Sequence, residues 1–238
     1  MGRPVTQVAV VIPTFNEAES IASVVGELPR TVVDRVIVAD GGSADGTAER
    51  ARGAGAEVIP VGRGYGLACL AGAQAAAEKD IVVFMDGDGA DDPAAIAALV
   101  GPIRAGDYDF VIASRARGER EPGSMAAHQL LAGLIAGRLT GLLYGTRYSD
   151  MCAFRAIRRD TLLKLGMREM TYGWNLEMQM RVARAGLRVL EVPVAYRKRL
   201  GGESKVAGSL RGSIKAGARI VTTFARVALE PTRKRATP

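Results

Sequence analysis

The chain has 238 residues, of which 48% are hydrophobic, and its formal net charge is +7 at neutral pH. This length and apolar content suit one α/β domain with a full core, and they exclude a low-complexity chain. Two cysteines, Cys69 and Cys152, stand in apolar stretches and are too few for a disulfide framework. Because His128 is the only histidine, a zinc site made of cysteine and histidine is also excluded.

The positive charge is concentrated near the C-terminal end. Residues 197–238 contain 11 Lys and Arg against 2 Asp and Glu, so the rest of the sequence is slightly acidic. Such a tail can attract an anionic membrane surface, a lipid phosphate or a nucleic acid, or it can be a solvated end without a partner. Nucleic acid is disfavoured, because few aromatic residues are interleaved with the basic ones.

The first half of the chain alternates buried strands with helices. The expected strands are 8–12, 36–39, 58–61, 81–85 and 110–113, and the expected helices are 17–28, 44–54, 67–78 and 93–103. Pro13 is expected to end the first strand. The alternation predicts an α/β fold with a doubly wound, mostly parallel sheet flanked by helices. In such sheets, ligands bind outside the carboxyl ends of the strands.

The second half is less regular. We expect helices over 125–145, 176–185 and 210–229 and a strand over 189–194. Glycines recur every four residues in the first of these helices, which favours close packing, with a lipid-facing helix as the alternative. Arg138 interrupts its apolar run, so no membrane span is expected, and neither is a signal peptide. We divide the chain into a domain over 1–208 and a basic amphipathic helix and tail over 209–238.

The strongest chemical signal is the tripeptide Asp86-Gly87-Asp88 after a buried apolar run. Two carboxylates at a strand end suit Mg²⁺ or Mn²⁺, which then bridges to substrate phosphates. Gly87 is expected to keep the backbone slim beside a diphosphate. The alternative, two solvated acids in a turn, is disfavoured because a buried strand leads directly into the pair.

Two further segments have weaker signals. Asp40 also ends a predicted strand, where a carboxylate can bind a base or ribose, whereas Asp45 is better explained as part of a turn and helix cap. The glycine-rich segment 62–66 lacks the Lys-Ser/Thr of a phosphate-binding Walker loop and is weak evidence alone.

Several motifs occur together in order and carry a family resemblance. They are 13–17 (PTFNE), 38–47 (VADGGSADGT), 86–88 (DGD), Arg115, Asp150, 154–156 (FRA) and 202–205 (GESK). In this combination the sequence resembles glycosyltransferase family 2 over about residues 7–206. Within that family it is most similar to the dolichol-phosphate mannose synthase-like, polyprenyl-phosphate branch.

The resemblance implies a GT-A fold and an inverting, metal-dependent transfer of a hexose. The donor would be a nucleotide diphosphate sugar of the GDP-mannose or UDP-glucose type, and the acceptor would be a polyprenyl phosphate. The implied roles are as follows: Asp86 and Asp88 for the metal; Pro13, Thr14, Glu17, Asp40, Gly64, Asp86 and Gly87 for the nucleotide sugar; Asp88, Arg115 and Glu177 for catalysis; Arg117, Arg199, Ser204 and Lys205 for the acceptor phosphate.

The sequence departs from the family pattern at several positions. Gly41 replaces an acid that often follows Asp40, and a lysine common near Tyr65 is missing. Ala90 stands where relatives often have a glutamine, which leaves water or Asp91 to complete metal coordination.

Three alternatives remain open at this stage. Glu177 could be a general base for a soluble or glycan hydroxyl acceptor, or it could orient neighbouring groups around a phosphate acceptor. Trp174 could stack on a sugar or pack at a helix start. The chain could also be a non-catalytic nucleotide-sugar-binding module. We expect peripheral contact with the inner, cytoplasmic face of the cell membrane, and homo-oligomers are possible.

Overall fold

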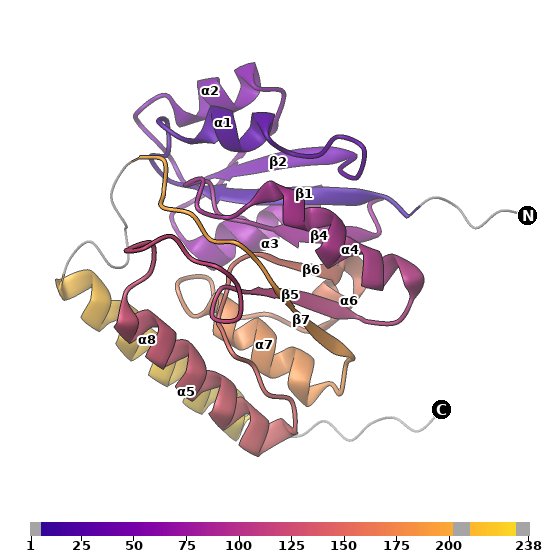
Figure 1. Cartoon of the computed structure of the whole chain (residues 1–238), viewed down its shortest axis with the longest axis vertical. Helices are drawn as coiled ribbons and strands as arrows, with labels where there is room; N and C mark the ends of the chain where they lie inside the picture. Colours follow the sequence, from indigo (N-terminus) through magenta and orange to yellow (C-terminus); the bar gives the residue numbers. More distant parts are fainter. Residues whose placement is uncertain (1–5, 202–209, 232–238) are drawn as a thin grey trace, which may run out of the picture.

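The computed structural model describes residues 6–201 and 210–231, with the side chains of 210–216 excepted. Its centre is a seven-stranded sheet with the order β3-β2-β1-β4-β6-β5-β7 (Figure 1). The strands are β1 (Val8–Thr14), β2 (Arg35–Asp40), β3 (Glu57–Pro60), β4 (Ile81–Phe84), β5 (Phe110–Ser114), β6 (Arg155–Arg158) and β7 (Val189–Pro193). The predicted mostly parallel sheet is confirmed.

β1 runs past Pro13, where the sequence predicts its end. It pairs with β2 through Pro13 and Thr14, which face Ala39 and Asp40. The carbonyl of Val11 accepts from the amide of Met85, so the backbone N–H and C=O groups of odd-numbered residues in β1 point toward β4. The ladder with β4 ends at Val11, and proline therefore loses no hydrogen bond by lacking an N–H.

β6 is the one strand that the sequence analysis did not predict. It lies between β4 and β5 and is antiparallel to both. Arg155 and Ala156 are fully buried, although the strand (RAIR) contains two charged residues and only one large apolar residue, an isoleucine. The guanidinium of Arg155 donates to the carbonyls of Ala153, Cys152 and Asn175, which allows an arginine to lie in the core.

The helices of the first half are shorter than predicted. They are α1 (Ile21–Gly26), α2 (Thr47–Gly53), α3 (Tyr65–Ala75) and α4 (Ile96–Ala105), the last preceded by the 3₁₀ turn η1 (Pro93–Ala95). α1 starts after Glu17, whose carbonyl accepts from the amides of Ser20 and Ile21 in a turn before the helix, and Asn16 has a left-handed φ of 53°. This irregular entry is fixed by the amides of Asn16 and Glu17, which donate to Ser43 and to Thr47 at the start of α2.

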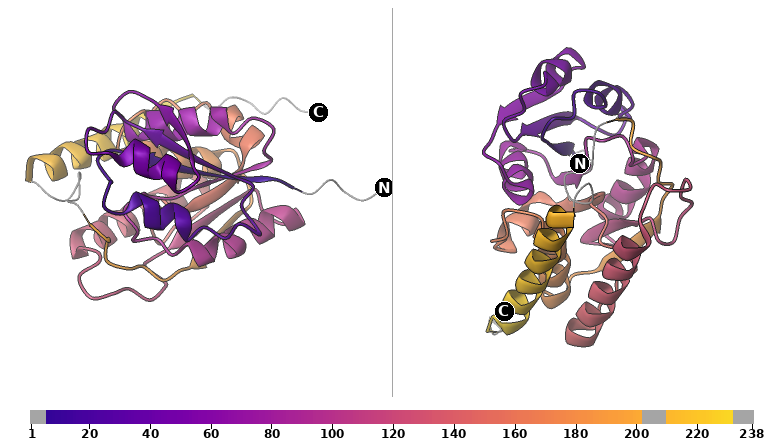
Figure 2. Two further views of the ribbon diagram at one scale, coloured as in Figure 1. Left: turned by 90° about the horizontal axis from the view of Figure 1, so that it is seen from above. Right: turned by 90° about the vertical axis from the view of Figure 1, so that its left-hand side faces the viewer.

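The helices cover both faces of the sheet. α3 and α4 lie on opposite faces (Figures 1 and 2). The second half adds α5 (Ala127–Tyr144), α6 (Arg159–Lys164), α7 (Trp174–Arg184) and α8 (Leu210–Leu229). α7 contacts α3, and both α5 and α8 pack against α7. Buried Ala136, Met180 and Val227 join these three helices into a second small core.

α5 and α8 project from the same end of the protein (Figure 2). On α5, Gly133 and Gly137 lie against the backbone of residues 148–151, which explains the predicted need for small residues there. Its opposite side exposes large apolar side chains, namely Leu131, Ile135, Leu139, Leu142 and Leu143. In the part of the chain that the structure describes, no helix is long and apolar enough to cross a bilayer.

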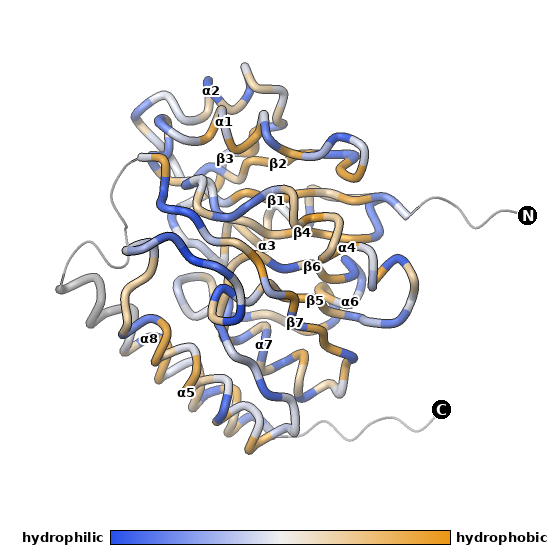
Figure 3. Tube along the Cα trace, in the orientation of Figure 1, coloured by the Kyte–Doolittle hydropathy of each residue, from blue (hydrophilic) through white to orange (hydrophobic). Residues whose placement is uncertain are grey.

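Hydropathy follows this architecture. β1 and β4 near the middle of the sheet are hydrophobic, whereas the segments that follow β5 and β7 are hydrophilic (Figure 3). Both segments lie at the edge formed by the carboxyl ends of the parallel strands, so polar side chains gather there.

Candidate active site

The candidate site lies at this carboxyl edge. Asp40 is the last residue of β2, Asp86 and Asp88 follow β4, and Arg115 follows β5. The segment after β7 reaches the same edge, since the amide of Leu200 donates to the carbonyl of Asp88 at 2.9 Å. Leu200 also covers Gly89, whose φ of 79° makes the turn after Asp88 possible. Four segments distant in sequence therefore meet at one acidic turn.

Asp86 is held between an aromatic hydroxyl and a second buried acid. The Tyr65 hydroxyl donates to Asp86 Oδ1 at 3.2 Å, and the Asp86 amide donates to Asp91 Oδ2 at 3.2 Å. Burial, followed by the negative charge of Asp88, raises the pKa of Asp86 to about 6. Burial and the charge of Asp86 raise the pKa of Asp91 to about 8. A concentration of negative charge in a partly dry site creates a strong preference for a cation.

Asp88 already contacts a cationic side chain. Arg199 Nη2 donates to Asp88 Oδ2 at 2.9 Å and lies 3.8 Å from Glu17 Oε1. The other carboxylate oxygen of Asp88 accepts from the amide of Ala90 at 3.0 Å. The resemblance assigns Arg199 to the acceptor phosphate, and the structure places it at the acidic turn.

The donor set fits a hard divalent cation that substrate phosphates help to bind. Among the described residues, no group of three or more His, Cys, Asp or Glu side chains is arranged to hold a metal ion. A cation at Asp86 and Asp88 would therefore need phosphate oxygens or water to complete its shell, which is the usual arrangement for Mg²⁺ in nucleotide sites. Asp91 is 3% exposed and accepts from the Asp86 amide, so it stabilises the backbone of the turn.

Arg115 is fixed by Asp150. Its Nε and Nη2 donate to the two carboxylate oxygens of Asp150 at 2.9 and 2.8 Å, and its amide adds a third bond at 2.9 Å. These bonds outweigh burial and lower the pKa of Asp150. The guanidinium also lies 5.0 Å from the ring of Tyr196. Arg115 is thus a preorganised cation next to the acidic turn, and its positive charge partly offsets the rise in the pKa of Asp86.

The predicted nucleoside residues lie together at the ends of β1 and β2. Thr14 Oγ1 donates to Asp40 Oδ1 at 3.2 Å, and Asp40 Oδ2 accepts from the amides of Gly42 and Ser43. Asp40 is buried and shapes this loop, and its contact with a base remains a prediction. A side chain at Gly41 would be in tight contact, since a Cβ there would lie 3.2 Å from the Thr14 carbonyl, so the acid common in relatives would need a small local shift.

The two glycines assigned to the donor have different surroundings. A Cβ at Gly64 would lie 2.6 Å from the carbonyl of Met170, so the loop before α3 is packed tightly against that segment. A Cβ at Gly87 would point toward Thr14 and Ile12. Gly87 therefore packs tightly against β1, and its predicted approach to a diphosphate stays a prediction.

Glu177 is enclosed by the protein, whereas a general base has to reach the proton that it removes from the substrate. Its side chain has no exposed surface, and its oxygens accept from the amides of Arg168 and Glu169 and from Arg181. These hydrogen bonds outweigh burial and lower its pKa. The arrangement favours the orienting role, and a role in catalysis stays a prediction. Trp174 is also fully buried, which favours the packing alternative.

Other predicted residues lie at the rim or outside the description. Arg117 is about half exposed and 4.0 Å from Glu191. Ser204 and Lys205 lie outside the described residues. Asp45 accepts from the amides of Thr47 and Ala18, which fits its structural role in the turn, whereas the N-cap position of α2 is taken by Gly46.

Sequence reasoning missed two contributors to the site. Tyr65 was noted because a lysine is missing near it, yet its hydroxyl contacts Asp86 directly. Tyr196 packs beside Arg115 and bridges to Asp91. Tyr65 stands in a glycine-rich segment and Tyr196 directly precedes the basic run 197–199, and neither pattern predicts the contact that the tyrosine makes.

The sheet order, the helices on both faces and the acidic turn at the carboxyl edge define the GT-A fold class. The model of glycosyl transferase family 2 matches residues 9–166, and the chain belongs to this family.

Its relatives and structural neighbours agree with this assignment. An uncharacterized glycosyltransferase of Mycobacterium tuberculosis is 37% identical over 87% of this chain and 93% of the relative. The undecaprenyl-phosphate mannosyltransferase of Micrococcus luteus is 34% identical over 87% of this chain and 90% of the relative. Glucosyl-3-phosphoglycerate synthase of M. tuberculosis, solved with Mn²⁺, uridine diphosphate and glucosyl-3-phosphoglycerate, is 25% identical. The structural match to this synthase has a TM-score of 0.73 and covers 95% of this chain and 81% of the synthase chain.

Proposed function

We propose that the protein transfers a hexose, with inversion, from a nucleoside diphosphate sugar to the phosphate of a polyprenyl lipid. The observation that carries this proposal is the acidic turn, where the partly buried Asp86 and Asp88 face the cations Arg199 and Arg115. Such a site matches a reaction that joins an anionic donor to an anionic acceptor. The 34% identity to an undecaprenyl-phosphate mannosyltransferase supports the lipid acceptor.

Asp86 and Asp88 are the residues that would hold Mg²⁺ or Mn²⁺. When bound, the ion supplies Lewis acidity that stabilises the departing diphosphate. Tyr65 keeps the Asp86 carboxylate in place, and Asp91 fixes the backbone of the same turn. A structural neighbour was solved with Mn²⁺ and uridine diphosphate, which supports the use of a divalent ion here.

Arg115 is the residue best placed to bring the two anions together. Asp150 binds its Nε and Nη2, so the guanidinium has one fixed orientation. Its Nη1 makes no hydrogen bond to the residues described here and can donate to a phosphate oxygen. Arg199 would release Asp88 and bind phosphate once a donor is present. Arg117 and Lys205 would add positive charge on the acceptor side.

The acceptor chemistry fits the burial of Glu177. A phosphate monoester has its second pKa near 6, so it is mostly dianionic at neutral pH and can attack without strong base assistance. The burial of Glu177 agrees with this route and speaks against a hydroxyl acceptor that needs a proton removed.

The protein would work at a membrane surface, on its inner face, with α5 in contact with lipid. Five large apolar side chains are exposed on α5, and Leu142 among them is 80% exposed. Arg138 lies on the same helix, and basic residues extend along α8. Apolar side chains flanked by basic ones give reversible attachment to anionic bilayers.

A donor and acceptor panel tests the proposal. GDP-mannose and UDP-glucose are incubated with a polyprenyl phosphate or with 3-phosphoglycerate, in the presence of Mn²⁺ or of EDTA. We expect transfer to the lipid phosphate from one donor, abolished by EDTA. Transfer to 3-phosphoglycerate alone, or full transfer in EDTA, would contradict the proposal.

A further inference from the structure

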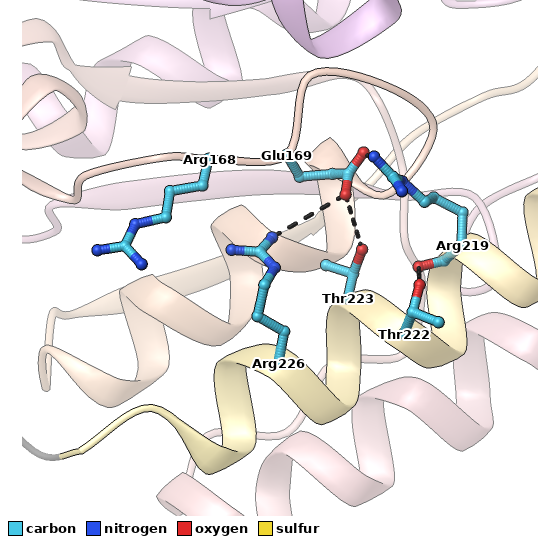
Figure 4. A pocket seen from close by; sticks show the side chains of 6 residues that line it. All are labelled: Arg168, Glu169, Arg219, Thr222, Thr223 and Arg226. Atoms are coloured by element: carbon cyan, nitrogen blue, oxygen red, sulfur yellow. Dashed lines mark hydrogen bonds and ion pairs between the residues drawn. The ribbon is translucent and has the colours of Figure 1, made fainter.

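A second group of charged residues lies on the other side of the start of α3, where Glu169 packs against Gly66. It surrounds a cavity of about 300 Å³ between α8 and the segment that leads into α7 (Figure 4). The cavity is lined by Arg168, Glu169, Arg219, Thr222, Thr223 and Arg226. None of these residues belongs to the predicted donor, metal or acceptor sites, so the proposed transfer reaction leaves the cavity unexplained.

The acid in the cavity wall is fully engaged by the protein. Glu169 is 3% exposed, and its oxygens accept from the hydroxyl of Thr223 and from Nε of Arg219, each at 3.0 Å. The amide of Thr171 donates to the same carboxylate at 3.0 Å. Glu169 therefore fixes the wall and has little capacity left to bind a cation from solution.

Arginines outnumber acids in the connected ion-pair network around the cavity. Five arginines are linked to three glutamates by ion pairs of 4.0 Å or less, which leaves two positive charges uncompensated. The members are Arg168, Arg181, Arg184, Arg219, Arg226, Glu169, Glu177 and Glu230. The excess charge matches that of a phosphate monoester dianion.

The arginines with spare donors stand on either side of the cavity. Arg168 and Arg219 are 71% and 51% exposed, and within the described ranges the Nη atoms of both lack a hydrogen-bond acceptor. Between them lies Arg226, directed toward Glu169 (Figure 4). Its Nη atoms are shielded from solvent without a well-aligned acceptor, although Glu177 is 3.1 Å away. The positive charge at this wall is thus only partly balanced by hydrogen bonds.

We propose that this cavity binds a phosphate group through Arg168 and Arg219, with Arg226 contributing charge from behind. Guanidinium groups bind phosphate oxygens strongly because their donors match the oxyanion geometry. The phosphate can come from a lipid headgroup, since α8 also exposes Val221 and Leu229, or from a soluble phosphate. The ligand class is the same in both cases.

Titration with inorganic phosphate tests the site without sugar transfer. The full chain in EDTA is titrated calorimetrically, and wild type is compared with Arg168→Gln/Arg219→Gln. The control is Arg50→Gln/Arg52→Gln, which removes the same charge from exposed residues of α2. We expect a phosphate-binding event that weakens at least about tenfold in the first variant and persists in the control. Equal isotherms for the two variants would overturn the proposal.

Two additions keep the test decisive. Arg168→Gln alone changes a mostly exposed side chain, so it should fold normally and still weaken phosphate binding; unchanged binding would count against the site. Co-sedimentation with phosphatidylcholine vesicles, with and without phosphatidic acid, whose headgroup is a phosphate monoester, then separates the sources. A loss of binding to anionic vesicles that is selective for the cavity variant assigns the site to a headgroup. Equal binding of cavity and control variants, together with weakened phosphate titration, assigns it to a soluble phosphate.

Discussion

Arg199 donates from Nη2 to Asp88 Oδ2 at 2.9 Å, across 111 residues of sequence. This pair connects the segment after β7 with the turn after β4, and Glu17 lies 3.8 Å from the same nitrogen. The contact shows that the acidic turn attracts positive charge from a neighbouring segment. It also places a phosphate-binding type of side chain at the position where a donor diphosphate is proposed to lie.

The raised pKa of Asp91 predicts a specific pH dependence of stability. Its carboxyl is more easily kept neutral in the folded chain, with a pKa of about 8 against an ordinary 3.8. The stability it contributes is therefore complete below about pH 4 and is lost as pH rises toward 8. Asp91→Asn keeps an acceptor for the Asp86 amide and removes this titration. Between pH 5 and 8 in EDTA, urea unfolding should show the variant gaining at least about 1 kcal/mol relative to wild type. Parallel pH curves for the two proteins would contradict this account.

Removal of the partner of Arg115 should destabilise the fold. Asp150→Asn leaves a largely buried guanidinium without its carboxylate, which typically costs about 3 kcal/mol. The matched control is Asp109→Asn, which breaks an equally bidentate pair with the more exposed Arg188 and should cost clearly less. Unfolding free energies from urea titration compare the two variants. Equal losses would show that burial of the Arg115 pair is not what makes it important.

Glu177→Gln separates an orienting role from base catalysis. Because Glu177 is the fully buried partner of Arg181 and Arg226, we expect a loss of about 3 kcal/mol in unfolding free energy. Measured at a temperature where the variant stays folded, kcat should remain within about threefold of wild type. A loss of about 10³ in kcat with unchanged stability would instead identify Glu177 as a base.

The exposed leucines of α5 should govern membrane contact. Leu131→Ser/Leu142→Ser should reduce partitioning onto phosphatidylglycerol vesicles by at least about tenfold, since each buried leucine contributes about 1.5–3 kcal/mol. Leu163→Ser changes an exposed leucine on α6 and serves as the control. Co-sedimentation measures both. If the two variants partition alike, α5 is not the lipid-facing helix.

Local sequence patterns were sufficient for most of the sheet and for the acidic turn. The apolar runs before Asp40 and Asp86 are long and β-branched, so the strands and the edge where they end could be predicted. β6 could not, because its buried position depends on Arg155 donating to backbone carbonyls just before the strand and to the carbonyl of Asn175, which α7 brings close. No local periodicity encodes such a contact.

The limits at the site have a similar origin. The family resemblance named Asp86, Asp88 and Arg115, and the structure brings them to one edge. The contacts of Tyr65 with Asp86 and of Arg199 with Asp88 depend on how α3 and the segment after β7 fold back over that edge. Such long-range approaches are tertiary properties, which motif spacing does not specify.

The most direct test of the central claim compares Asp88→Asn with Asp107→Asn, an equivalent change at an exposed position. Sugar transfer to polyprenyl phosphate is measured at saturating donor with a titration of Mn²⁺. We predict that Asp88→Asn lowers kcat by about 10² or more at every Mn²⁺ concentration, while Asp107→Asn behaves as wild type. Full transfer by the Asp88→Asn protein would contradict the account.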